Sequence, residues 1–131
     1  MVSVATQNTQ GLNTELEIRC WKQYLIEEKV DICCVTETHT DERRAEMMKD
    51  ILADKFHYIT KIRKNRKRRE YGSGGLAILV RKRVGDLIKK KSGGSDEILW
   101  GEVGKLERKL IIGAVYLVPI KSTRYKNKRE Q

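Results

Sequence analysis

The sequence lacks a long apolar segment and has few of the residues that build disulfide or metal frameworks. Its longest apolar stretch, residues 110–120, is interrupted by glycine and proline and is too short to span a bilayer. The three cysteines, Cys20, Cys33 and Cys34, have no metal-site spacing. The N-terminus lacks a basic segment followed by an apolar stretch, so we expect no signal peptide. We therefore expect reduced cysteines, an intracellular location in the nucleus or cytoplasm, and no membrane partner.

Positive charge is what the chain has in excess. Lys and Arg number 28 against 18 Asp and Glu, which gives a formal net charge of +10 over 131 residues. The length suits one compact domain. The charge favours a polyanionic partner, usually nucleic acid and sometimes an anionic membrane. A soluble basic protein with no such partner is the alternative that charge alone leaves open.

Hydrophobic periodicity and capping signals predict a mixed α/β domain. Thr14 and Glu17 fit a capping box at the start of a helix that ends near Lys29. A second helix begins near Thr40, and Val84 opens one short helical turn. We expect Cys33 and Cys34 to point to opposite faces of their strand. Strands are predicted at residues 2–5, 31–35, 56–62, 76–80, 98–103 and 110–118.

Two of these strands, residues 76–80 and 110–118, are apolar throughout. Such runs are typical of strands that are covered on both faces of a sheet. The two helices can cover one face, and no other predicted element covers the second. We therefore expect a mixed β-sheet with helices on one face, whose open face is covered by further polypeptide or by self-association.

Three polar residues fall at or beyond the ends of predicted strands: Asn8, Glu37 and Tyr116. A carboxylate is a hard-oxygen ligand for Mg²⁺. An amide can orient a phosphate oxygen, and a phenol can donate to charge that develops in a transition state. Without further information, caps or surface groups are the simpler interpretation of such residues.

Four motifs change that balance because they occur in order over nearly the whole chain, at residues 8–12, 31–39, 74–80 and 115–119. Together they resemble the N-terminal half of the endonuclease/exonuclease/phosphatase family. The greatest similarity is to the apurinic-endonuclease-like domain of non-LTR (LINE-type) retrotransposons, in which Glu-Thr-His and Gly-Gly-x-Ala-Ile are familiar.

The resemblance implies half of a four-layered α/β sandwich, with each half of the family's domain supplying one sheet. It also implies phosphodiester hydrolysis that depends on Mg²⁺ or Mn²⁺, with DNA as the expected partner. By position, Glu37 would ligate the metal, Asn8 would hold the scissile phosphate or the attacking water, and Tyr116 would hydrogen-bond the phosphate. We expect residues 1–120 to form this partial domain and residues 121–131 to form a basic, frayed tail.

The chain departs from the family pattern in ways that bear on activity. Gln10 stands where some relatives have Asp, and Pro119 lies three residues after Tyr116 rather than two, a spacing that we associate with retrotransposon-like members. The later Asp-x-Asn and Ser-Asp-His motifs are absent, and no His or Asp follows Asp96. The resemblance therefore predicts a DNA-nicking module that is inactive alone.

A basic run offers a second hypothesis, that of a non-catalytic nucleic-acid-binding fragment. Seven of nine consecutive residues are basic, which suits contact with a phosphate backbone without reading sequence. A solvated loop is the alternative interpretation of the run. The seven are Lys61, Arg63, Lys64, Arg66, Lys67, Arg68 and Arg69.

Overall fold

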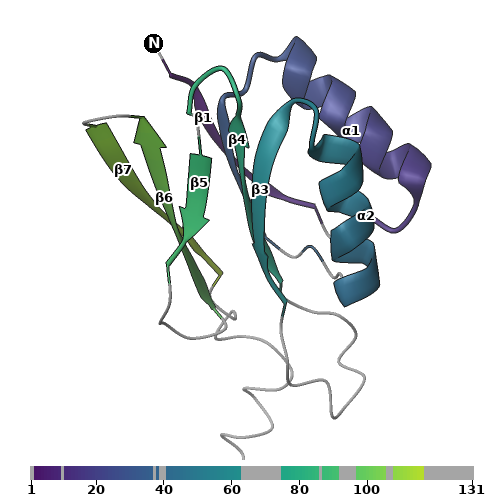
Figure 1. Ribbon diagram of the computed structural model, residues 1–131. Helices are drawn as coiled ribbons and strands as arrows, with labels where there is room; N and C mark the ends of the chain where they lie inside the picture. The colour runs from purple at the N-terminus through teal and green to yellow at the C-terminus, as the bar shows by residue number, and fades with distance from the viewer. Residues whose placement is uncertain are drawn as a thin grey trace, which may run out of the picture.

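The protein has three layers: a pair of helices, a four-stranded sheet and a three-stranded sheet (Figure 1). The computed structural model describes residues 2–9, 11–36, 38, 41–62, 75–85, 87–91, 97–105 and 108–116. The element order is β1 (Val4–Asn8), α1 (Glu15–Glu27), β2 (Ile32–Thr36), α2 (Glu42–Leu52), β3 (Phe56–Lys61), β4 (Leu76–Arg81), β5 (Leu87–Lys90), β6 (Ile98–Lys105) and β7 (Arg108–Val115).

The four-stranded sheet has the order β1-β2-β4-β3 and is mixed, as predicted. β1 pairs parallel to β2, and β4 pairs antiparallel to both β2 and β3. The crossover between β1 and β2 is α1, which begins at the predicted cap: the Thr14 hydroxyl accepts from the Glu17 N–H at 3.1 Å. The second helix begins at Glu42, close to the predicted start near Thr40, because Asp41 is the cap and accepts from the Arg44 N–H at 2.8 Å.

The helices cover one face of this sheet. Ile18, Trp21 and Leu25 of α1 and Met48 of α2 pack with the helix-facing residues of the strands, among them Cys33. Cys34 belongs to the cluster on the opposite face, which confirms the predicted alternation.

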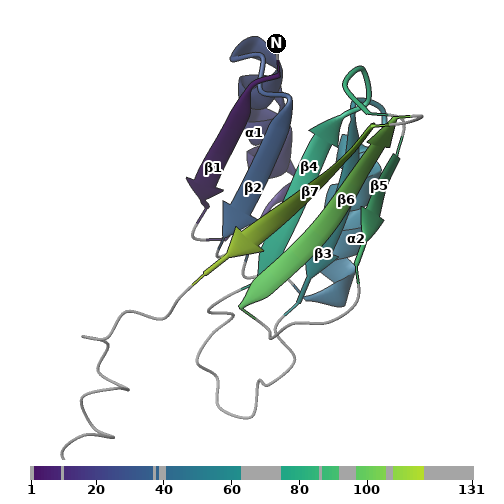
Figure 2. The ribbon, with the colours of Figure 1, turned by 90° about the vertical axis from the view of Figure 1, so that its left-hand side faces the viewer.

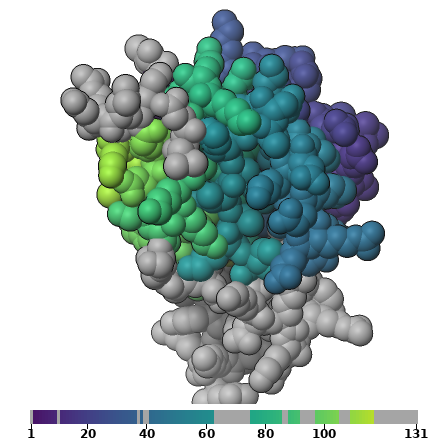
Figure 3. All heavy atoms as spheres, in the orientation of Figure 1, coloured from purple at the N-terminus to yellow at the C-terminus, as the bar shows by residue number. Residues whose placement is uncertain are grey.

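The opposite face is covered by this chain itself, so the prediction of an open sheet face was wrong. The three-stranded sheet, of order β5-β6-β7, packs against it and encloses a second apolar cluster. The cluster includes Ile78 and Val80 of β4 with Leu99, Val103 and Ala114 of the second sheet. Figure 3 shows the green surface of the second sheet adjoining the teal surface of β3. This chain therefore contributes strands to both sheets, and not to a single sheet as the resemblance implied.

Gly101 allows the two sheets to approach closely. A Cβ atom at this position would lie 3.0 Å from Ile59 Cδ1, 3.2 Å from Ile88 Cδ1 and 3.3 Å from Ile78 Cδ1. These three isoleucines come from β3, β5 and β4, so the glycine lies where strands of both sheets converge.

One other prediction about the second sheet was wrong. The expected helical turn around residues 84–88 ends instead in β5, because Leu87–Lys90 pairs with β6. The last strand, whose apolar run was expected to need cover from elsewhere, is partly exposed among its described residues: Leu110 is 52%, Ile111 56% and Val115 48% exposed. The predicted tail at residues 121–131 lies outside the described residues. None of the described helices is long and apolar enough to cross a membrane.

Candidate functional site

The carboxyl ends of four strands meet at one end of the molecule. β1 and β2 run parallel, and β3 runs in the same direction because both β2 and β3 are antiparallel to β4. Val115, at the end of β7, pairs with Ile98 at the start of β6, and Lys61 at the end of β3 reaches Ile98. Figure 2 shows β1, β2 and β7 pointing toward this end. We call it the site end.

Asn8 and Tyr116, both predicted as site residues, lie at the site end and face the space between the two sheets. Asn8 pairs with Thr36 in the parallel register, so both side chains are on the same face of their sheet. That face is the one toward the second sheet, because Cys34 two residues before Thr36 belongs to the interlayer cluster. Tyr116 follows β7 and packs, half-buried, against the same cluster. The two sheets thus contribute one predicted residue each.

Backbone hydrogen bonds fix the segments that carry these residues. Thr9 N–H donates to the Thr36 carbonyl at 3.1 Å, which extends the pairing beyond β1. Thr38 is fully buried, and its N–H donates to the Gly75 carbonyl at 3.3 Å. The Tyr116 N–H donates to the Glu97 carbonyl at 2.9 Å. The site end is therefore held by the sheets and not by side chains alone.

Glu37, the predicted metal ligand, lies outside the described residues. Its neighbours Thr36 and Thr38 are both described, and they are tied to β1 and to the start of β4 by the bonds given above. In the part of the chain that the structure describes, no group of three or more His, Cys, Asp or Glu side chains converges to hold a metal. The described donors do not form a metal site by themselves, so the metal remains an expectation that rests on Glu37.

Of the seven basic residues predicted to bind nucleic acid, Lys61 is described. Its ammonium group donates to the Ile98 carbonyl at 3.1 Å and so joins β3 to β6 across the two layers. Lys90 makes the reciprocal contact, from β5 to the Thr60 carbonyl at 2.9 Å. The other six, all between residues 63 and 69, lie outside the described residues.

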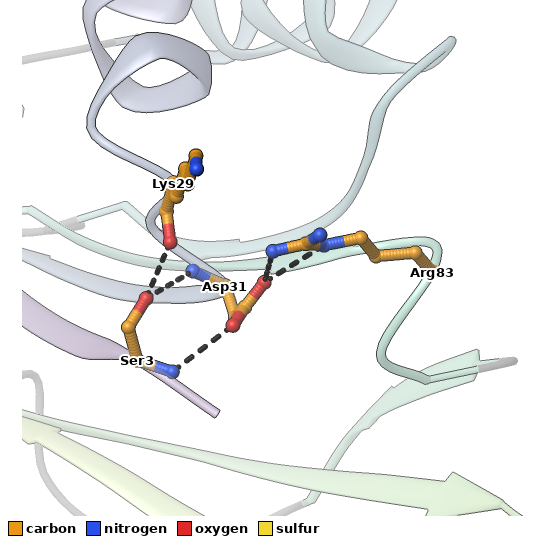
Figure 4. A network of polar contacts seen from close by, with 4 residues as sticks. All are labelled: Ser3, Lys29, Asp31 and Arg83. Carbon is orange, nitrogen blue, oxygen red and sulfur yellow. Dashed lines mark hydrogen bonds and ion pairs between the residues drawn. The ribbon is translucent and has the colours of Figure 1, made fainter. Parts of the chain in front are cut away.

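A second polar centre lies at the opposite end of β2 and has a structural character (Figure 4). The Asp31 side chain is 3% exposed, and its Oδ1 accepts from Arg83 Nε at 3.0 Å and Nη2 at 2.8 Å. Its Oδ2 accepts from the Ser3 N–H at 3.0 Å, while the Ser3 hydroxyl donates to the Lys29 carbonyl. Burial works to raise the pKa of Asp31, but the bonds from Ser3 and Arg83 and the charges of Arg83 and Arg81 outweigh it and lower that pKa.

The two buried cysteines have the properties of core residues. Burial raises the pKa of Cys33 to about 12, with a smaller contribution from Cys34, and burial also raises the pKa of Cys34. A thiol that stays protonated at neutral pH is a poor nucleophile and a poor metal ligand. Burial therefore disfavours the reactive thiolate at both positions near neutral pH.

Solved structures share this fold, although no protein-family model and no curated protein matches the sequence. The AP endonuclease LMAP from Leishmania major has a TM-score of 0.66 at 12% identity, over 94% of this chain and 42% of its own. An AP endonuclease from Archaeoglobus fulgidus has a TM-score of 0.59 at 22% identity, over 99% of this chain and 48% of its own. The Xenopus laevis APE2 catalytic domain has a TM-score of 0.58 at 12% identity, over 95% and 48%.

This likeness confirms the predicted fold class. The chain has a mixed α/β fold with two helices that matches half of the AP endonuclease α/β sandwich. It spans slightly less than half the length of each of these structures. At these identities the likeness shows the fold, and the chemistry has to be argued from the chain's own residues.

Proposed function

We propose that this chain is the N-terminal part of a divalent-metal-dependent phosphodiesterase that nicks DNA. The observation that carries the proposal is the convergence of Asn8, Tyr116 and the segment on either side of Glu37 at one end of the space between the sheets. The AP endonuclease fold and the net charge of +10 both favour a DNA substrate.

Each residue has a role that its placement allows. Asn8 ends β1 on the interlayer face, where its amide would orient a phosphate oxygen or the attacking water. Tyr116 comes from the second sheet and would donate its phenolic hydrogen to the same phosphate. Glu37 would hold Mg²⁺ or Mn²⁺, a hard cation that would polarise a phosphoryl oxygen when bound. The described residues bring no group of three or more His, Cys, Asp or Glu side chains together, so we propose weak metal binding and no turnover by this chain alone.

Manganese binding tests the metal site without requiring turnover. Substoichiometric Mn²⁺ should broaden the amide NMR signals of Asn8, Thr36, Thr38 and Tyr116 in the isotope-labelled chain. Signals at the opposite end of β2 serve as the internal control. Glu37→Gln should abolish the localised broadening and leave the rest of the spectrum unchanged. Broadening that is spread evenly over the chain, or that persists in Glu37→Gln, would contradict the proposal.

Binding to duplex DNA is a separate measurement, and it also tests the alternative of a non-catalytic basic fragment. The logarithm of the affinity should fall linearly with the logarithm of salt concentration. Replacing the six basic residues between 63 and 69 by Gln should flatten this slope by up to about five, since each phosphate contact contributes about 0.9. The control neutralises Lys49 of α2 and Lys55 in the turn that follows α2, both of which are exposed. Salt-sensitive binding together with no localised metal site would favour the alternative.

The origin in a retrotransposon-like element rests on sequence motifs alone. The Glu-Thr-His segment, the Gly-Gly-x-Ala-Ile segment and the spacing between Tyr116 and Pro119 support it. A preference for a target-site sequence over an abasic site in the DNA-binding assay is the result expected from that origin, and the reverse preference would contradict it.

A further inference from the structure

The helix layer differs in charge from the rest of the chain. Residues 14–28 and 41–52, which hold α1 and α2 with their caps, contain eight carboxylates and five basic side chains. Their net charge is −3, in a chain whose net charge is +10. Figure 1 shows both helices on the side of the first sheet that faces away from the second sheet. The outer surface of this layer is therefore unsuited to a nucleic-acid backbone or an anionic membrane.

Three side chains on the outer surface of α1 form a row at four-residue spacing. Leu16 is 72% and Tyr24 is 53% exposed, and Cys20 between them is exposed as well. Residues four apart on a helix lie one above the other on the same face. Such a row is the ridge that enters the groove of a second helix in the commonest class of helix packing. We call these three residues the α1 ridge.

The charge at the end of α1 is unfavourable within this chain. Glu27 is the last residue of the helix and Glu28 is its C-cap, and the last turn of this helix contains no basic residue. A helix C-terminus carries a partial negative charge, which favours Lys or Arg there and disfavours acidic side chains. Lys29 follows the cap as the next basic residue in the sequence. A cation brought to this end from outside would meet two carboxylates and the helix carbonyls together.

The borders of the α1 ridge are acidic on balance. Arg19 lies beside the ridge, but its guanidinium is paired with Glu15 at 2.8 Å. Among the described residues, the other three carboxylates of α1 and its cap make no ion pair. These are Glu17, Glu27 and Glu28. The face thus combines exposed apolar side chains with carboxylates that have no cation of their own.

We propose that the outer face of α1 binds a basic amphipathic helix of another protein, a role that does not depend on the function proposed above. Apolar residues at helical spacing on the partner would pack over the α1 ridge. Lys or Arg beside them would meet Glu17 at one end of the ridge and Glu27 and Glu28 at the other. A second copy of α1 has the same net negative charge, so self-pairing would bring like charges together.

A synthetic peptide tests this surface. The probe is a blocked peptide of about 18 residues that carries Leu along one helical face and Lys elsewhere. One control has the same composition without helical periodicity, and the other keeps the pattern but replaces Lys with Glu. On addition to the full chain, the probe should shift the amide NMR signals of residues 16–28 and slow the alkylation of Cys20. Neither control peptide should do so.

Variants separate the apolar and the charged parts of the surface. Leu16→Gln combined with Tyr24→Gln should weaken probe binding about tenfold or more without a change in net charge. Glu27→Gln combined with Glu28→Gln should weaken it about threefold to tenfold, yet leave the unfolding midpoint unchanged or raised, because acid is removed from a helix C-terminus.

The matched control makes the same charge change on the neighbouring helix. Glu42→Gln combined with Asp50→Asn, both exposed on α2, should leave probe binding within about twofold of wild type. An equal loss in this control and in the Glu27 and Glu28 variant would show attraction by net charge alone and would overturn the proposal. Unchanged affinity in the Leu16 and Tyr24 variant would overturn it too. A concentration-dependent dimer that the same variant dissociates would instead assign the ridge to a second copy.

Discussion

Removal of the Asp31 carboxylate should destabilise the protein strongly and in a pH-dependent way. The side chain is 3% exposed and accepts one hydrogen bond from Ser3 and two from Arg83. Breaking a buried ion pair by removing one partner costs about 3–5 kcal/mol when the other charge stays buried. Arg83 is 57% exposed and regains water, so we expect about 2–3 kcal/mol for Asp31→Asn at pH 7.

The pH dependence has a definite sign. The folded-state pKa of Asp31 is lowered, so its contribution is present above the unfolded value of about 4 and is lost as the pH falls through the folded value. The difference between wild type and Asp31→Asn should therefore shrink in acid. Arg83→Ala should weaken the pH dependence of stability, because the hydrogen bond and the charge of Arg83 are two of the causes that lower the pKa of Asp31.

Urea unfolding between pH 3 and pH 8 measures both effects. At pH 7 the midpoint for Asp31→Asn should fall by about 1 M or more at an unchanged slope, given slopes of roughly 1–3 kcal/mol/M. The control is Arg19→Ala, which breaks an exposed pair with Glu15 on α1 and should change stability by about 0.5 kcal/mol or less. Equal destabilisation at pH 3 and pH 7, or a loss no larger than in the control, would refute this account of Asp31.

Three further outcomes are expected. Gly101→Ala should destabilise the fold by about 1–3 kcal/mol in thermal unfolding, because its Cβ would meet Ile59 at 3.0 Å, and truncation of Ile59 to Val should recover part of the loss. Lys29→Gly should stabilise the protein by up to about 1 kcal/mol in the same assay, because Lys29 has a φ of 55° directly after α1; no gain would mean that its conformation is unstrained. A thiol reagent at pH 8 should modify exposed Cys20 quickly and Cys33 only on unfolding. Because burial raises the pKa of Cys33 to about 12, the stability of the fold should fall as the pH rises from about 9 toward that value.

The first sheet could be predicted from the sequence because its signals are local. The cap at Thr14 and the apolar run of β4 each specify an element with little help from distant residues. The alternation of Cys33 and Cys34 followed from the two-residue period of a strand. The placement of Asn8 and Tyr116 at one end followed once the strand directions were known.

The second sheet was harder to predict because non-local pairing determines it. Residues 84–88 have helical spacing, yet β5 is formed by pairing with β6. In β6, buried Leu99 and Val103 alternate with exposed or half-buried residues, but Gly101 and Gly104 interrupt the apolar signal. Trp100 is 39% exposed and lies over Gly113 on the outer face. The strands that cover the first sheet are therefore present in this chain, but no local sequence pattern predicted that they form a second sheet.

The site depends on both sheets, and this links its geometry to the interlayer core. Asn8 belongs to the first sheet and Tyr116 follows the last strand of the second, so their separation is set by how the two sheets pack. At the site end that packing is reinforced by the Lys61 contact with the Ile98 carbonyl, which lies opposite Val115 in the register. A change that shifts the sheets should alter the relation between Asn8 and Tyr116 without touching either residue. The core between the sheets is therefore part of what positions the site, and the residues proposed to contact phosphate are only its exposed end.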